Sequence, residues 1–241
     1  MPYRGIKIAS LFSGGKDSTY ALHWAFLKGF SPEVLVTLKP SRPNSWMFHR
    51  PAVELTRLQA EALGMPLIYV ETSGVRGEEL RDLESALREA RIRYGVYGVV
   101  TGALLSDYQR MNINIVAHRV GLKVYSPLWR KDQEEYMRSL VRHGFRFILT
   151  SASAYGMDGS LLGRPVDASL LEEILGRAKR YGFNPAFEGG EAETLVLDAP
   201  LFKKRLAVRG RVERVGDYEW RFLIEEAWLE EKVVVHGGAS S

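Results

Sequence analysis

The sequence predicts an α/β fold, in which helices sandwich a parallel sheet, followed by a smaller α+β region. Three observations predict it. Apolar runs and helical stretches alternate strictly through the first half of the chain. A glycine turn separates the first apolar run from the first helical stretch, as in a strand–loop–helix unit. After residue 129 the alternation stops, and several apolar runs follow one another without helices between them.

The first region consists of repeated strand–helix units. The predicted strands are 6–12, 33–38, 67–70 and 96–101, and the predicted helices are 17–28, 53–63, 78–93 and 107–120. In the first helix, Tyr20, Trp24 and Leu27 fall on one stripe. Glu–Arg pairs along the third helix indicate a solvated face. Ser106 and Gln109 predict a capping box at the start of the fourth helix.

Ligands of parallel sheets lie beyond the carboxyl ends of the strands. Four loops are therefore expected to converge on one site: 13–17, 39–49, 72–77 and 102–107. Pro40, Pro43 and Asn44 exclude a helix from the second of these loops. It is either a flap over the substrate or a plain surface loop.

The second region combines helices over 133–143 and 168–181 with strands over 145–151, 194–197, 206–215 and 218–226. The last two strands face each other across Gly216 and Asp217, which predicts a hairpin. We place a domain boundary near residue 130. The predicted domains are then 1–130 and 131–235, with a frayed tail at 236–241.

Composition narrows the class of protein. The chain has 241 residues, 46% of them hydrophobic, and a net charge of +4, which suits a protein with an anionic substrate. It has no dense basic tract with aromatics, so we do not expect direct RNA binding. No apolar stretch is long enough to span a membrane, and the N-terminus lacks a secretory signal, so we expect a cytoplasmic protein.

The absence of cysteine excludes whole classes of chemistry. No disulfide, thiolate metal site, persulfide or cysteine-dependent glutaminase is available to this chain. None of the five histidines stands near another in sequence, so a histidine metal site is not expected.

Residues 13–18 read Ser-Gly-Gly-Lys-Asp-Ser, directly after the first apolar run. The glycines let backbone N–H groups approach a ligand, and the helix N-terminus behind them adds partial positive charge. Lys16 can add a full charge. The Walker spacing is excluded, because Asp17 follows Lys16 and Ser10 stands where the first glycine would fall. The string predicts a phosphate or pyrophosphate site; the alternative is an ordinary glycine turn.

A second string, at 188–198, reads Glu-Gly-Gly-Glu-Ala-Glu-Thr-Leu-Val-Leu-Asp. It gathers three carboxylates around a Gly-Gly turn before an apolar strand. Burying several carboxylates together is energetically unfavourable, so they are expected either to be exposed to solvent or to have a function. From composition alone, a plain acidic turn that enters a strand is the favoured interpretation.

The first string resembles the PP-loop of the N-type ATP pyrophosphatases, which cut ATP between its α and β phosphates. The second string points to one branch of that superfamily, and the chain resembles the diphthamide synthetase (diphthine–ammonia ligase) family, its archaeal members in particular. Further matching stretches are 47–49, 59–62, 106–110, 121–122, 127–129, 162–164 and 200–202. The resemblance implies a HUP-type nucleotide domain followed by a smaller domain particular to this family.

The sequence also departs from the family pattern. Ala192 stands where the family usually has an aromatic residue, and Leu161 where it has a tryptophan. Asn112 and Asn114 stand where it tends to have Arg and Glu. These departures allow a divergent paralogue with another acceptor.

The resemblance implies a reaction in which diphthine, the modified histidine of elongation factor 2, is amidated to diphthamide. The diphthine carboxylate would attack the α-phosphorus of ATP and release pyrophosphate. Ammonia would then attack the acyl adenylate and release AMP. Mg²⁺ would accompany ATP. The partners would be elongation factor 2 and ammonia, with a homodimer as one option for assembly.

The resemblance also assigns roles to residues. The ATP-binding residues would be Ser13, Gly14, Gly15, Lys16, Asp17, Ser18 and Gly102, with Asp17 also on the metal. The catalytic residues would be Lys16, Asp17, Asp107, Glu188 and Glu191, and the substrate residues Tyr108, Arg110, Glu188, Glu191 and Thr194.

Several of these residues have plainer alternatives. Lys16 could point to solvent, and Asp17 could cap the helix. Asp107 suits the first turn of any helix. Trp129 could offer a cation–π face or lie in the core. For the whole chain, the alternatives are a PP-loop ligase that adenylates another carboxylate or tRNA, and a non-catalytic nucleotide-binding module.

Overall fold

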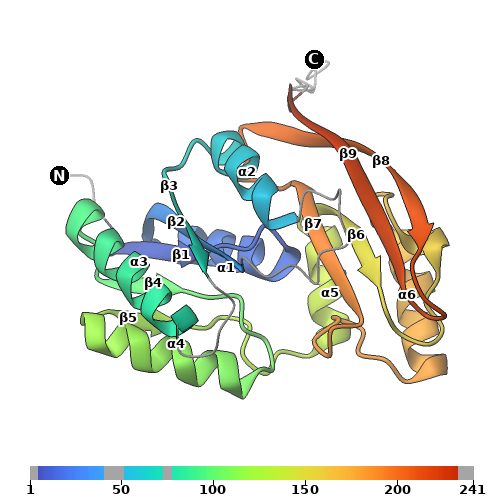
Figure 1. The fold of residues 1–241 in the computed structure, drawn as a ribbon, viewed down its shortest axis with the longest axis horizontal. Coiled ribbons are helices and arrows are strands. Elements are labelled where there is room, and N and C mark those ends of the chain that lie inside the picture. The colour runs from blue at the N-terminus through green and yellow to red at the C-terminus, as the bar shows by residue number, and fades with distance from the viewer. Residues whose placement is uncertain (1–4, 41–51, 73–77, 233–241) are drawn as a thin grey trace, which may run out of the picture.

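A computed structural model of the chain describes residues 5–40, 52–72 and 78–232. These residues form a five-stranded parallel sheet and a four-stranded antiparallel sheet, each with helices of its own (Figure 1). The fold class that the sequence predicts is therefore confirmed. The loops predicted at 39–49 and 72–77 and the tail lie wholly or almost wholly outside the described residues.

The parallel sheet has the order β3-β2-β1-β4-β5. Its strands are β1 (Lys7–Leu11), β2 (Ser31–Pro40), β3 (Leu67–Thr72), β4 (Gly98–Val100) and β5 (Lys123–Tyr125). The first four confirm the predicted strands. The sequence analysis missed β5, because three residues are too few to show the alternation that marks a strand.

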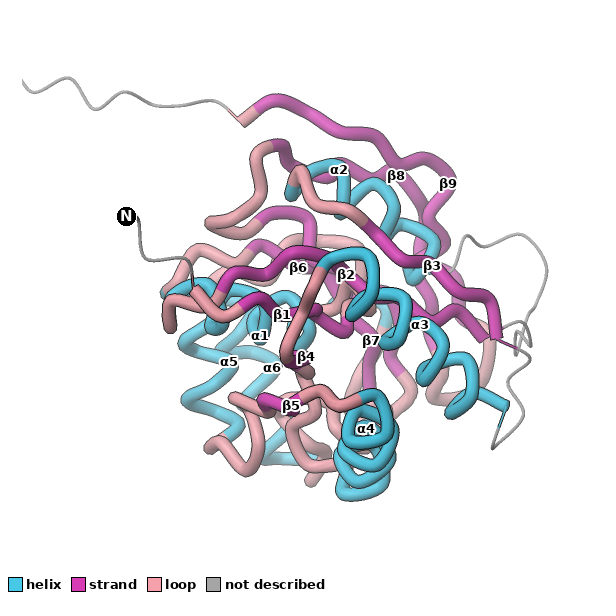
Figure 2. The backbone as a smooth tube through the Cα atoms, turned by 90° about the vertical axis from the view of Figure 1, so that its left-hand side faces the viewer, coloured by secondary structure: helices cyan, strands magenta, loops and turns pink. Residues whose placement is uncertain are grey.

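The helices of this region are α1 (Lys16–Leu27), α2 (Thr56–Leu63), α3 (Glu78–Tyr94) and α4 (Asp107–Val120), with a 3₁₀ turn (Ala52–Leu55) before α2. Side chains of α3 and α4 share one apolar cluster with β1, β2 and β4. On the other face, Ala21 and Ala25 of α1 pack against Ile8 and Val100. Figure 2 shows α1 on the opposite side of the sheet from α3 and α4.

The buried face of α1 differs from the predicted stripe. Leu27 is 81% exposed, whereas Ala21, Leu22 and Ala25 are fully buried. The sheet covers one side of α1 and the second region covers another, so small residues face the sheet at close range. The periodicity of the large side chains alone could not show this.

The antiparallel sheet has the order β7-β6-β9-β8. Its strands are β6 (Arg146–Ala152), β7 (Ala192–Asp198), β8 (Lys204–Arg214) and β9 (Trp220–Glu231). Its helices are α5 (Gln133–Arg142) and α6 (Ala168–Tyr181), with a 3₁₀ turn at Gly159–Leu161. The predicted hairpin is confirmed, because β8 and β9 pair antiparallel up to Arg214 opposite Trp220. Arg–Glu pairs such as Arg205–Glu230 cross this hairpin on exposed positions.

One apolar cluster joins the two regions. It contains Leu22 and Leu63 from the first region together with Tyr136, Phe147 and Leu171 from the second. A domain boundary near residue 130 stays a prediction, since the packing is continuous across it. Among the described residues, no helix has both the length and the apolar character needed to cross a membrane.

Candidate active site

The loop at 13–18 lies at the carboxyl end of β1, between β1 and α1. The strand order reverses between β1 and β4, which is where open α/β sheets bind ligands. The Ser18 hydroxyl accepts a hydrogen bond from the Ser13 N–H at 3.2 Å and donates to the Gly15 carbonyl at 3.2 Å. Gly14 has a φ of +80°, which glycine adopts without strain. The loop is thus closed by its own side chains.

Four N–H groups of this loop remain available for a ligand. Those of Gly14, Gly15, Asp17 and Ser18 make no hydrogen bond to any other described residue. The first N–H groups of a helix have no partner within it. Together with the partial positive charge of the α1 N-terminus, they make an anion-binding concavity.

The edge strand β7 supports the loop from the second region. Val196 N–H donates to the Gly14 carbonyl at 3.0 Å, and Lys16 N–H donates to Thr194 Oγ1 at 3.2 Å. Gln59, fully buried, donates to the carbonyls of Gly14 at 3.0 Å and Val196 at 2.7 Å. Thr194, expected on the substrate side, therefore contacts the loop itself. Gln59 had no predicted role, and only its place in a matching stretch singled it out.

Lys16 and Asp17 form a pair inside this site. Lys16 is only 2% exposed, so the alternative in which it points to solvent is wrong. Its Nζ lies 2.9 Å from Asp17 Oδ2 and 5.5 Å from the centroid of the Phe187 ring. The other oxygen of Asp17, Oδ1, accepts a hydrogen bond from the Tyr136 hydroxyl at 2.8 Å. Burial raises the pKa of Tyr136 well above its ordinary value, so its hydroxyl stays a donor.

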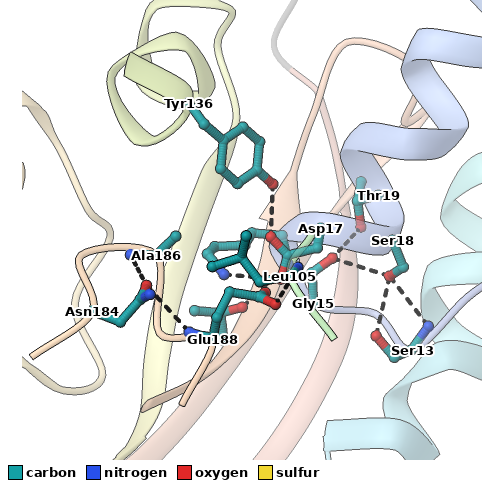
Figure 3. A network of polar contacts seen from close by, with 12 residues as sticks. Ser13, Gly15, Asp17, Ser18, Thr19, Leu105, Tyr136, Asn184, Ala186 and Glu188 are labelled. Atoms are coloured by element: carbon teal, nitrogen blue, oxygen red, sulfur yellow. Dashed lines mark hydrogen bonds and ion pairs between the residues drawn. The ribbon is translucent and has the colours of Figure 1, made fainter. Parts of the chain in front are cut away.

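Glu188 joins this pair from the second region. Its Oε2 accepts a hydrogen bond from the Leu105 N–H at 3.0 Å, across the loop between β4 and α4. Burial raises the pKa of Glu188, and the neighbouring charge of Asp17 raises it further. Figure 3 shows Glu188 beside Asp17, with Tyr136 approaching Asp17 from above. Lys16, Asp17 and Glu188, predicted from two distant strings, are therefore brought together.

The turn that carries Glu188 is held by two side chains. Asn184 Oδ1 accepts from the N–H groups of Ala186 at 2.9 Å and Glu188 at 3.3 Å. The carboxylate of Glu191 accepts from Asn184 N–H at 3.1 Å and from Gly189 N–H at 2.8 Å. Both oxygens of Glu191 thus bind the backbone of its own turn. These bonds account for Glu191 as a structural residue of the turn. Its catalytic role stays a prediction. No prediction from the sequence assigned a role to Asn184.

The residues predicted on α4 lie farther out. Asp107 is exposed and forms an ion pair with Arg110 at 3.6 Å. The Arg110 guanidinium lies 4.5 Å from the centroid of the Trp129 ring, and Trp129 is half-buried instead of lying in the core. Tyr108 is 57% exposed. No hydrogen bond or ion pair joins Asp107 or Arg110 to Lys16, Asp17 or Glu188 among the described residues.

Asn112 and Asn114, where charged residues were expected, bind their own helix. Asn112 Nδ2 donates to the Tyr108 carbonyl at 2.9 Å, and Asn114 Nδ2 donates to the Arg110 carbonyl at 2.7 Å. The predicted cap is confirmed, because Ser106 Oγ accepts from Gln109 N–H at 3.2 Å. Neither asparagine places a charge near Lys16.

Gly102 has a packing role that the sequence did not suggest. A Cβ at this position would lie 2.6 Å from both the Asp17 carbonyl carbon and the Ser18 nitrogen. The end of β4 therefore lies directly against the first turn of α1. Gly102 was expected to admit adenosine, and its contact with adenosine stays a prediction.

The donor set fits a polyphosphate with a divalent cation. Within the described ranges, no group of three or more His, Asp or Glu side chains is arranged to hold a metal by itself. Mg²⁺ is commonly bound through one or two carboxylates together with phosphate oxygens. Asp17 can supply such a carboxylate, and Lys16 and the N–H groups that have no partner among the described residues can bind phosphate.

A broad hollow of about 750 Å³ lies elsewhere, between α6 and the β8–β9 turn, and is lined among others by Tyr155, Arg177 and Tyr218. None of the residues predicted for the site lines it. The candidate site at the 13–18 loop is therefore identified by its charged side chains and N–H groups and not by the size of a pocket.

Comparison with known proteins gives matches over most of the chain. Two family models, described as the N-terminal and C-terminal domains of diphthamide synthase, match residues 6–124 and 132–233. A Bos taurus protein named diphthine–ammonia ligase is 32% identical over 222 residues, which cover 84% of this chain and 83% of that protein. The protein of that name from Homo sapiens is 31% identical with the same coverage. One from Schizosaccharomyces pombe is 33% identical over 219 residues, which cover 84% of this chain but 36% of that longer protein.

Proposed function

Since the chain belongs to the diphthamide synthase family, we propose that its 13–18 loop binds ATP while the carboxyl group of diphthine is activated for reaction with ammonia. The product is an amide, so the protein is a ligase that forms a C–N bond. Membership of this family implies that ATP drives the reaction. The proposed protein substrate is elongation factor 2 that carries diphthine.

Activation is needed because a carboxylate is a poor acyl donor. A carboxylate oxygen of diphthine attacks the α-phosphorus of ATP, the bond to the β-phosphate oxygen breaks, and pyrophosphate leaves. Ammonia then attacks the acyl carbon of the adenylate, and AMP leaves with the carboxylate oxygen. One proton of the ammonia is lost as the amide forms.

The residues of this chain stabilise the charge that develops on the leaving pyrophosphate. The N–H groups of Gly14, Gly15, Asp17 and Ser18 are fixed before the ligand arrives, so no reorganisation is needed at the moment of reaction. Lys16 supplies a full positive charge in a buried position, where charge interactions are stronger than in water. Asp17 is the proposed Mg²⁺ ligand.

Glu188 is the proposed contact with the acceptor. It comes from the second region, lies beside Asp17, and has a raised pKa because it is buried near that charge. A carboxyl group with a raised pKa is suited to accept the proton that ammonia loses. It can also attract the trimethylammonium group of diphthine.

The observation that carries the proposal is the meeting of a buried lysine, two carboxylates and four unpaired N–H groups at one loop of a chain from this family. The test incubates the protein with ATP labelled at the α-phosphate, ammonium and elongation factor 2 that carries diphthine. We expect labelled AMP and a new amide on the factor. ADP in place of AMP, or AMP formed equally well with unmodified factor, would refute the proposal.

A further inference from the structure

Tyr136, on α5 of the second region, contacts the nucleotide loop, and the proposed reaction does not use its side chain. Tyr136 on α5 is 2% exposed, and its hydroxyl donates to Asp17 Oδ1 at 2.8 Å. Its ring packs edge-on against Tyr20, with the centroids 5.3 Å apart. The ring of Tyr136 therefore packs against Tyr20, and its hydroxyl hydrogen-bonds to Asp17.

Asp17 is consequently held at both carboxylate oxygens. Tyr136 binds Oδ1 from the second region, and Lys16 Nζ binds Oδ2 at 2.9 Å from the loop. Each carboxylate oxygen has two acceptor positions, so lone pairs remain for a ligand. The side chain of Asp17 is 27% exposed, which leaves those lone pairs accessible.

Without the Tyr136 hydroxyl, Lys16 would be the one side chain of the described residues that still holds the carboxylate. The terminal torsion of aspartate is broad, so one contact does not fix the plane of the carboxylate. Metal ligands bind best when neighbouring groups hold them in orientation. A hydroxyl that contacts the carboxylate from the opposite side of the site fits that requirement.

We infer that Tyr136 is a positioning residue, which fixes the carboxylate of Asp17 in the orientation that meets the metal–nucleotide complex. This inference rests on the proposed function, because it assumes that Asp17 meets Mg²⁺ and ATP. It means that the second region completes the nucleotide site in addition to contacting the acceptor. Tyr136 acts through Asp17 and does not touch the nucleotide.

The test compares two tyrosine hydroxyls in one aromatic pair. Tyr136→Phe removes the hydroxyl on Asp17 and keeps the ring against Tyr20. Tyr20→Phe removes the hydroxyl that lies 3.3 Å from Lys131 Nζ and makes no contact with Asp17 among the described residues. Isothermal titration calorimetry with α,β-methylene ATP, which resists cleavage between its α and β phosphates, measures binding in the full-length proteins without turnover. Each titration is run with Mg²⁺ and again in EDTA.

With Mg²⁺, we expect Tyr136→Phe to weaken binding about tenfold, the scale of one hydrogen bond to a charged group, and Tyr20→Phe to change it less than twofold. In EDTA, Tyr136→Phe and the unsubstituted protein should bind alike. Thermal melts should show all three proteins folded with similar midpoints.

Equal binding of Tyr136→Phe and the unsubstituted protein with Mg²⁺ would overturn the inference. An equal loss with and without Mg²⁺ would overturn it too, because the hydroxyl would then act on the fold and not on the metal-facing carboxylate. If the unsubstituted protein binds no nucleotide under either condition, the proposed function itself fails and takes the inference with it.

Discussion

Gly102 has no Cβ, and this allows the end of β4 to approach the 13–18 loop closely. A Cβ there would meet backbone atoms of Asp17 and Ser18 at 2.6 Å, a distance that cannot be relieved by turning a side chain. The clash would displace the first turn of α1, which carries two of the four unpaired N–H groups. Position 102 thus acts on the site through the backbone.

We predict that Gly102→Ala lowers AMP formation at least tenfold and destabilises the fold by about 1–3 kcal/mol, the usual cost of forcing extra atoms into a packed site. The control is Gly176→Ala in α6, where a Cβ would meet nothing within 4 Å. That change should stabilise the fold by about 0.5–1 kcal/mol, since alanine favours helix over glycine. Urea unfolding and an AMP assay check both variants. Full activity in Gly102→Ala would contradict the close approach of β4.

Single residues show where sequence reasoning succeeds and where it stops. Lys16, Asp17 and Glu188 stand in two strings that the family resemblance assigns to one site, and the structure brings them together. Tyr136 acts on Asp17, which only the folded chain brings near it. Asn184 binds N–H groups of its own turn, at Ala186 and Glu188, and an asparagine in a turn does not by itself indicate which groups it binds. The pairing of Glu191 with its own turn also required the backbone path, because a carboxylate near two glycines suits either role.

At the scale of elements, α1 is held from both sides, and His23 connects it to the second region. His23 Nδ1 lies 2.7 Å from the Thr19 carbonyl, and its Nε2 accepts from Leu201 N–H at 2.9 Å. The ring therefore has to be neutral to keep both contacts. Burial lowers the pKa of His23 to about 4.

This pKa predicts how stability depends on pH. Since the folded pKa of His23 lies below its ordinary 6.5, the unfolded chain binds more protons between these values. The contribution of His23 is complete above pH 6.5 and is lost as the pH falls toward 4. The unfolding free energy should drop by about 3 kcal/mol over this range from His23 alone.

Urea unfolding at a series of pH values measures this dependence. His23→Gln, which keeps an acceptor near Leu201 but does not titrate, should show a shallower acid loss than the unsubstituted protein. His118→Gln, at an exposed position on α4, should leave the pH profile unchanged. Parallel profiles for His23→Gln and the unsubstituted protein would show that another group is responsible.

Elements differ in how well the sequence predicts them. Long helices and strands with clear periodicity, such as α3 and β8, are confirmed with small shifts of their ends. The strand predicted at 218–226 is confirmed as β9, which continues beyond its predicted end to Glu231. β5 was missed because it is defined by its neighbour β4 and not by any pattern of its own. The stripe on α1 was misassigned because a helix covered on two sides does not have one apolar face.

At the scale of the whole molecule, the two regions share one apolar cluster and a polar connection through Gln59. Gln59 lies on α2 of the first region and binds carbonyls on both sides of the contact with β7. Periodicity predicted two regions with different architecture, and this is confirmed. Periodicity could not predict that the two regions share one apolar core, because the residues at their contact are spread over both halves of the sequence.

We predict that Gln59→Leu destabilises the protein by about 2 kcal/mol, because it removes two buried hydrogen bonds. The thermal midpoint should fall by roughly 4–8 °C for a chain of this size. Glu61→Ala, exposed on the same helix, should shift the midpoint by no more than about 1 °C. Calorimetry measures both. Equal midpoints for Gln59→Leu and Glu61→Ala would show that the connection contributes nothing to the fold.

The contact between Gly14 and Val196 has a consequence beyond catalysis. β7 is the outermost strand of its sheet, and an uncovered outermost strand offers backbone groups to which a foreign strand can add. Here the 13–18 loop shields part of that strand edge. Substitutions that loosen the loop would then promote aggregation as well as lower turnover. Selection against aggregation would preserve the loop even in a related protein that no longer uses ATP.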